Sequence, residues 1–229
     1  MPRLGVKQRL HRFWEEDRGL SVLLAFTAVI SFVVAPLAES SRGGGTILRA
    51  CVTLLFAYGA FVLSTRRRAR LVIALLTAVP ISLAWLEAFH PGPSWSAAAA
   101  AAACLFALML STLIIRRVFR AGPINIHRVV GSIVVYMMLG IAFGEAARFI
   151  AILDPQAYSS ANFARIDRPE LYYFSLVTLT TVGYGDITPL HPMARSLAVV
   201  EALTGQLFPA ILIARLVSQE LMSRPSPRD

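Results

Sequence analysis

Residues 178–186 read Thr-Leu-Thr-Thr-Val-Gly-Tyr-Gly-Asp, and the rest of the chain is best understood from this stretch outward. Two glycines, Gly183 and Gly185, alternate with the larger Val182 and Tyr184. Because glycine has no Cβ atom, it adopts backbone conformations that are costly for other residues. Gly183 and Gly185 therefore permit backbone dihedral angles that a side chain would penalise. A glycine-rich turn with an incidental aromatic residue is the simpler alternative.

The composition is that of a membrane protein. The chain has 229 residues, a net charge of +9, 56% hydrophobic residues, 15% charged residues and a mean hydropathy of +0.64. Soluble domains carry about 25% charged residues. The basic residues form short runs between apolar stretches, which is typical of membrane-flanking charge and not of a nucleic-acid interface. Cys51 and Cys104 lie inside apolar stretches and are interpreted as small buried hydrophobic residues.

Six apolar stretches are candidates for membrane-spanning helices, each of which needs about 20 residues. They cover residues 19–38, 46–65, 71–90, 95–115, 126–147 and 195–217. Arg49 lies near the start of the second stretch, where its long side chain can reach the headgroups. Roughly fifty residues separate the fifth stretch from the sixth, which is too many for a simple connection. This connection contains the glycine stretch.

The distribution of arginine and lysine predicts the orientation. Basic residues concentrate before residue 19, at Arg66–Arg70 and between Arg116 and Arg128. The positive-inside rule therefore places both termini in the cytoplasm, in a multi-pass protein of the cell (inner) membrane. Residues 1–18 are predicted to form a cytoplasmic amphipathic leader, a disordered basic leader being the alternative. A cleaved signal peptide is a second interpretation of the first span. Residues 218–229 are predicted to form a short cytoplasmic tail.

A short helix is predicted directly before the glycine stretch, over residues 168–180. Asp167 is suited to the N-cap, Pro169 to the first turn and Glu170 to the third position after the cap. Such a helix is too short to cross the membrane, so it must enter and turn back within protein. The partial negative charge at its C-terminal end favours a cation there.

Residues 180–186, TTVGYGD, resemble the selectivity filter of tetrameric pore-loop potassium channels. The resemblance is close over about residues 167–215. It implies that carbonyl oxygens of Thr181, Val182, Gly183 and Tyr184, with the Thr181 hydroxyl, replace the water shell of K⁺, and that Gly185 completes the filter over 181–186. One filter per chain cannot encircle an ion, so the resemblance also implies a homotetramer.

The resemblance assigns supporting roles to residues around the filter. Tyr173 and Phe174 correspond to an aromatic pair that braces the filter, and Thr180 begins it. Some bacterial members carry a glutamate where this chain has Val177, so Asp186 lacks that carboxyl partner. We predict instead a hydrogen bond between the Tyr173 hydroxyl and Asp186.

The last span, residues 195–217, corresponds to the inner helix of the family. Gly205 falls at the family's hinge glycine, and Pro209 removes a helix hydrogen bond, so we expect a bend. Helical spacing places Gln206, Pro209, Ile213 and Val217 on one stripe, which we assign to the inner cavity. The alternative is that these residues pack against the fifth span.

Glu201 lies one turn before Gly205. An unpaired carboxylate at membrane depth costs about 2.5 to 3.5 kcal/mol on insertion scales, so Glu201 needs a partner or water. One interpretation is an electrostatic lure for K⁺. The other, which we favour, is a hydrogen bond to the back of the pore helix.

Residues 19–120 are predicted to form a four-helix transmembrane domain without a voltage sensor. A sensor requires arginines at every third position within the membrane. Residues 88–115 contain no Lys, Arg, Asp or Glu, and positive-inside anchoring accounts for Arg116, Arg117 and Arg120. Residues 121–217 are predicted to form the pore domain. Surface charge is the ordinary interpretation of Glu87.

The sequence therefore predicts an all-α integral membrane protein with six transmembrane helices, a re-entrant pore helix with its filter between the fifth and sixth, and a tetrameric pore. We expect a K⁺-selective, weakly or not voltage-gated channel of bacterial source that contacts lipids and K⁺, has no enzymatic activity and needs no cofactor. The alternatives are a non-selective cation channel, a non-conducting membrane sensor or partner-binding protein, and a transporter subunit.

Overall fold

The computed structural model describes residues 21–34, 36–37, 44–63, 67–119, 126–160 and 166–223. The leader predicted over residues 1–18 and the last part of the predicted tail lie outside these ranges. Within them the chain is mainly helical. Residues 21–29 form a helix that continues into the π-helical segment η1 (Ile30–Val34). The other elements are α3 (Gly44–Leu63), α4 (Arg67–Phe89), α5 (Pro93–Val118), α6 (Ile126–Leu153), β1 (Tyr158–Ser160), α7 (Arg168–Leu179), β2 (Ile187–Pro189) and α8 (Pro192–Ser223).

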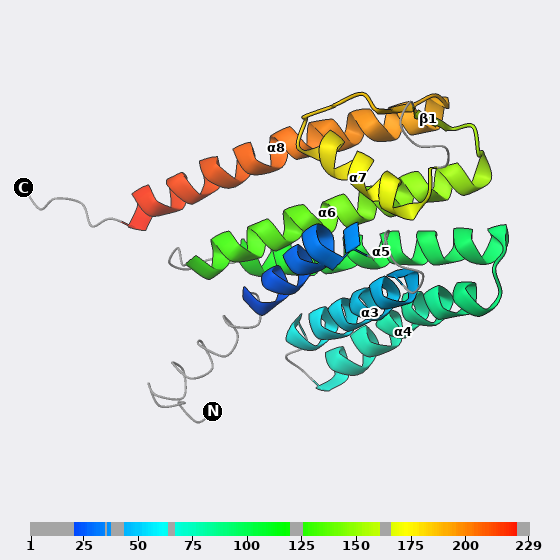
Figure 1. Ribbon diagram of the computed structural model, residues 1–229. Helices are drawn as coiled ribbons and strands as arrows, with labels where there is room; N and C mark the ends of the chain where they lie inside the picture. Colours follow the sequence, from blue (N-terminus) through cyan, green and yellow to red (C-terminus); the bar gives the residue numbers. More distant parts are fainter. Residues whose placement is uncertain are drawn as a thin grey trace, which may run out of the picture.

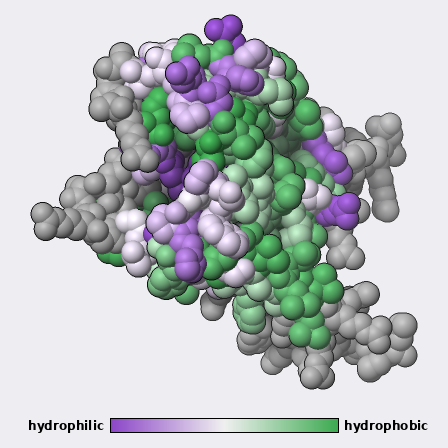
Figure 2. Space-filling model, turned by 90° about the vertical axis from the view of Figure 1, so that its right-hand side faces the viewer, coloured by the Kyte–Doolittle hydropathy of each residue, from purple (hydrophilic) through white to green (hydrophobic). Residues whose placement is uncertain are grey.

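Four of the described helices are long and apolar enough to cross a membrane: Leu71–Phe89, Pro93–Arg116, Arg128–Leu153 and Pro192–Arg215. Ser21–Val34 and Gly45–Phe61 are shorter apolar helices. Six spans therefore remain a prediction, with four of them supported by helix length and hydropathy. Large apolar side chains are exposed along these helices, and Figure 2 shows the broad hydrophobic areas that they form on one face.

The helix predicted over residues 126–147 runs on to Leu153, because charged residues near its end are paired with charges on other helices instead of ending the span. The helix predicted over 195–217 extends over Pro192–Ser223. The sequence did not indicate the short strands β1 and β2, which pair antiparallel with Ser159 opposite Thr188.

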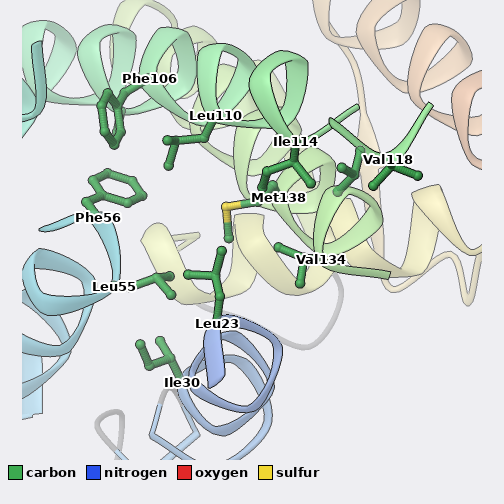
Figure 3. Packing of buried hydrophobic residues seen from close by; sticks show 12 residues of the cluster. Leu23, Ile30, Leu55, Phe56, Phe106, Leu110, Ile114, Val118, Val134 and Met138 are labelled. Atoms are coloured by element: carbon green, nitrogen blue, oxygen red, sulfur yellow. The ribbon is translucent and has the colours of Figure 1, made fainter. Parts of the chain in front are cut away.

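A hydrophobic core joins the first described helix, α3, α5 and α6 (Figure 3). Leu55, Leu110 and Met138 are each 1% exposed at its centre. The rings of Phe56 and Phe106 meet there, with their centroids 4.9 Å apart. This core attaches α3 and α5 to α6, and α6 also contacts α7 and α8.

Helix α7 lies between α6 and α8 (Figure 1). At 12 residues it spans about 18 Å at 1.5 Å per residue, well short of the roughly 30 Å hydrocarbon layer. The chain before α7 comes from the β1 side, and the chain after it returns through β2 into α8. Along the chain, the glycine stretch thus lies between a short helix and a long one.

Candidate functional site: the pore helix and the glycine stretch

Helix α7 begins where the sequence predicts it. The Asp167 amide donates to Glu170 Oε2 at 2.9 Å, and Pro169 occupies the first turn. The carboxylate of Glu170 thereby binds one of the amide groups that a helix start leaves without a partner.

The C-terminal end of α7 folds directly into the glycine stretch. The Thr180 amide donates to the Leu176 carbonyl at 3.0 Å, Thr181 to Thr178 at 2.9 Å, and Val182 to Val177 at 3.0 Å. The Thr180 hydroxyl donates to the Leu176 carbonyl at 2.7 Å. Because these bonds hold the chain against the helix end, the partial negative charge of that end lies beside residues 180–183.

The backbone of the glycine stretch alternates in conformation. Thr181, Gly183 and Gly185 have φ values of +58°, +59° and +78°, whereas φ is not positive at Val182 or Tyr184. Alternation of this kind turns successive peptide groups to the same side of the strand. A positive φ is accessible to glycine but strained for a β-branched residue such as threonine. The alternation in φ is the backbone pattern that a row of carbonyl groups on one side requires, and the positive φ at Thr181 adds strain that the sequence did not indicate.

Residues 181–185 are exposed in the single chain. The exposed fractions of Val182 and Tyr184 are 53% and 71%. Their side chains are therefore largely uncovered within one copy of the chain. Apolar and aromatic groups that are exposed next to a strained backbone are typical of a surface covered by other protein.

The predicted hydrogen bond between Tyr173 and Asp186 is present. The Tyr173 hydroxyl donates to Asp186 Oδ2 at 2.8 Å, and Asp186 Oδ1 accepts from the Ile187 amide at 3.1 Å. The bond to Asp186 raises the pKa of the Tyr173 phenol. These contacts hold the chain at the point where it leaves the glycine stretch.

A small aromatic cluster supports the other side of α7. Phe174 is 7% exposed, and the ring of Tyr158 meets it edge-on with the centroids 5.5 Å apart. Tyr158 belongs to β1, and burial raises the pKa of its hydroxyl. Phe174 thus faces the protein interior, whereas its neighbour Tyr173 faces Asp186. Val177, at the position of the family's glutamate, is half-buried.

Glu201 is fully buried at the back of the pore helix. The Ser175 hydroxyl of α7 lies within hydrogen-bonding distance of Glu201 Oε1 and, at 2.8 Å, of the Gly140 carbonyl of α6. Glu201 Oε2 has no partner among the described residues. The geometry therefore agrees with the interpretation in which Glu201 contacts the pore helix, and it joins α6, α7 and α8 through Ser175.

Gly205 lies where α8 contacts the C-terminal end of α7. A Cβ atom at this position would be 1.7 Å from the Leu179 carbonyl oxygen, so only glycine fits. Helix α8 continues without interruption through Gly205 and Pro209. The structure therefore gives Gly205 a packing role in addition to the hinge role expected from the resemblance. Gln206, Ile213 and Val217 are exposed in the chain, and Pro209 is half-buried.

A buried ionic network connects the helices before the pore domain to the start of α7. Arg148 on α6 pairs with Glu87 on α4, which is 9% exposed and also accepts from Ser96 Oγ on α5 at 2.8 Å. Arg148 reaches Glu145 Oε2 at 3.3 Å, and Arg168 Nε donates to Glu145 Oε1 at 2.8 Å. Glu87 is thus a buried network member, which corrects the surface-charge interpretation.

The functional region includes residues that sequence reasoning missed. They are Tyr136, Glu145, Arg168 and Ser175. Outside this region, on the side of α7 that meets η1, the hydroxyl oxygens of Ser31 and Tyr172 lie 2.7 Å apart. Each is a polar residue within or beside an apolar stretch. That was the available signal, because such groups need partners at membrane depth. Among the described residues no group of three His, Cys, Asp or Glu side chains is placed to hold a metal ion.

Comparisons with known proteins match the part of the chain that contains α7 and the glycine stretch. Residues 132–220 match a family model described as "Ion channel". Protein LctB of Bacillus caldotenax is 44% identical over 62 residues, 25% of this chain and 46% of that protein. The two pore potassium channel c of Oryza sativa subsp. japonica is 34% identical over 86 residues, covering 38% of this chain and 17% of that one.

A third relative is potassium voltage-gated channel subfamily A member 10 of Mus musculus, which is 29% identical over 92 residues, 40% of this chain and 17% of that one. The chain thus spans at most about half the length of the relatives it matches. The solved structures include no significant match.

Proposed function

We propose that four copies of this chain, whose matched part is similar to ion channels including potassium channels, assemble into a channel that conducts K⁺ passively and selectively across the membrane. One observation carries the proposal: φ is positive at Thr181, Gly183 and Gly185 and not at the residues between them. This geometry suits a row of carbonyl groups that replaces the water shell of an ion.

Assembly is the second part of the proposal. One strand supplies oxygens on one side of an ion only, so a closed ring needs further copies. The exposed Val182, Tyr184 and Ile213 provide apolar surface for such contacts. In the tetramer we assign Thr181–Tyr184 to K⁺ binding, Gly205 and Pro209 to the bending of the inner helix, and Gln206, Ile213 and Val217 to the inner cavity.

The membrane setting completes the proposal. The channel lies in the inner membrane with both termini in the cytoplasm, contacts lipid through its apolar helices, and needs no cofactor besides K⁺ as the permeant ion. The basic runs Arg66–Arg70 and Arg116–Arg120 support this orientation.

Ion flux from liposomes containing the purified full chain tests the proposal. K⁺ and Na⁺ gradients are compared for the unmodified protein and for Gly183→Ala, which places a Cβ atom at φ +59°. We expect K⁺ flux well above Na⁺ flux and its loss in the variant. Equal K⁺ and Na⁺ flux would indicate a non-selective cation channel instead.

If the purified protein shows no ion flux, a second measurement is needed. Thermal unfolding in K⁺ and in Na⁺ reports ion binding without conduction, because a ligand that binds only the folded state raises its stability. Stabilisation by K⁺ that disappears in Gly183→Ala would support a closed channel. Identical thermal unfolding in K⁺ and in Na⁺, together with the absence of ion flux, would contradict the proposal.

A further inference from the structure

The carbonyl group of Leu179 receives a hydrogen bond from outside its own helix. Leu179 is the last residue of α7, is 0% exposed, and lies two residues before Thr181. The hydroxyl of Tyr136, on α6, donates to the Leu179 carbonyl oxygen at 2.9 Å. A buried carbonyl at a helix end needs such a donor, because the helix itself provides none.

The same carbonyl oxygen touches the inner helix. A Cβ atom at residue 205 would lie 1.7 Å from it and 2.7 Å from the Leu179 carbonyl carbon. The backbone of α8 is therefore in direct contact with this peptide group. Leu179 is held between the hydroxyl of Tyr136 on one helix and the backbone of Gly205 on another.

The contacting turn of α8 is also a weakened turn. Pro209 lies four residues after Gly205 and has no N–H, so the Gly205 carbonyl lacks its helix donor. Phe208, beside this proline, packs its ring against Tyr136 with centroids 6.0 Å apart and an interplanar angle of 32°. Tyr136 thus contacts both the end of the pore helix and the least constrained turn of the inner helix.

We propose that Tyr136 is a positioning residue for the inner end of the filter, and that it links the position of the Leu179 carbonyl to the 205–209 turn of α8. The inference rests on the proposed function, since it concerns the same row of carbonyl groups. Movement of the turn changes the Phe208 contact with Tyr136 and the Gly205 contact with Leu179 together. Both changes reach Thr181 through only two intervening peptide groups.

The test uses the full chain in liposomes with the variant Tyr136→Phe. The ring and its packing remain, and only the hydroxyl is lost. The matched control is Tyr172→Phe, which removes the hydroxyl paired with Ser31 from α7 itself. Two readouts are taken: the ratio of K⁺ to Na⁺ flux, and hydrogen exchange of the amides in residues 180–186.

We expect Tyr136→Phe to lower the flux ratio and to speed amide exchange in this segment by roughly fivefold, the factor that corresponds to one hydrogen bond of about 1 kcal/mol. Tyr172→Phe should leave both readouts near the unmodified values. Phe208→Leu, which keeps the hydroxyl of Tyr136 but removes the ring contact, should change both readouts in the same direction and less.

Unchanged exchange in Tyr136→Phe would overturn the inference, as would equal changes in Tyr136→Phe and Tyr172→Phe, which would indicate general destabilisation. The exchange measurement does not require conduction. If the unmodified protein carries no K⁺ flux and unfolds identically in K⁺ and Na⁺, the proposed function fails separately, and exchange alone still decides whether Tyr136 orders residues 180–186.

Discussion

At the scale of single residues, the end of the glycine stretch at Asp186 is held by one phenol. Tyr173→Phe removes the 2.8 Å bond to Asp186 and leaves the ring in place. We expect K⁺ to stabilise the protein less and K⁺ flux to decay faster, because Asp186 loses its side-chain donor. The measurements are thermal unfolding as a function of K⁺ and the time course of flux.

Tyr158→Phe is the matched control, since the Tyr158 hydroxyl has no partner among the described residues. Flux and K⁺ stabilisation equal to the unmodified protein in both variants would contradict a role for Tyr173.

Glu201→Gln separates an electrostatic role from a structural one. The side chain is fully buried and meets Ser175 behind the pore helix. We expect unchanged single-channel conductance and a stability lower by about 1 to 3 kcal/mol, the usual cost of disturbing a buried polar contact. Bilayer recording at low K⁺ and thermal unfolding provide the two values. A marked loss of conductance at low K⁺ with unaltered stability would favour the electrostatic lure.

The sequence predicts some of these residues and not others for a physical reason. Tyr173 and Asp186 lie in or near the recognisable motif, so their hydrogen bond could be predicted from the resemblance. The partners of Ser175 and Tyr136 lie 26 to 43 residues away along the chain. Only the packing of α6, α7 and α8 brings these groups together, and no local pattern specifies it.

At the scale of elements, the pair Glu87 and Arg148 joins α4 to α6. Removing Glu87 leaves Arg148 only its contact with Glu145, and removing Arg148 leaves Glu87 only the Ser96 hydroxyl. Breaking a buried ion pair costs up to about 3 to 5 kcal/mol. We expect Glu87→Gln and Arg148→Gln each to destabilise the protein, and the double variant to cost less than the two effects added together. Unfolding measurements on all four proteins give the coupling energy. Strictly additive effects would rule out a direct energetic contribution of the pair.

Gly205→Ala tests the contact between α7 and α8. Alanine in place of glycine usually stabilises a helix interior by about 1 kcal/mol. Here we expect the opposite sign and loss of K⁺ flux, because the new methyl group would displace the Leu179 carbonyl. Gly45→Ala, with no atom within 4 Å of the added group, is the control. Normal flux in Gly205→Ala would show that α7 has room to shift.

Element boundaries were predictable where caps and hydropathy agree. Asp167, Pro169 and Glu170 located the start of α7 correctly. Charged residues misled the prediction for α6, because Glu145 and Arg148 resemble the end of a span until their partners on α4 and α7 are known. The strands β1 and β2 have three residues each, too few for a periodic pattern.

At the scale of the whole molecule, no gating charge is found in α5 between Pro93 and Ile115. Steep voltage dependence requires several charges moving through the membrane field. We expect the conductance in planar bilayers to change little with voltage between symmetric positive and negative potentials. A steep sigmoidal dependence would contradict this and would assign charge movement to another part of the chain.

The alternating backbone at Thr181, Gly183 and Gly185 also bears on how the protein is made. Aligned carbonyl dipoles repel one another, and a left-handed threonine adds strain, so one newly inserted copy gains little from adopting this shape by itself. A cation held between several copies removes the repulsion for all of them at once. In the proposed assembly, the bound ion would then act as a template for the association of subunits.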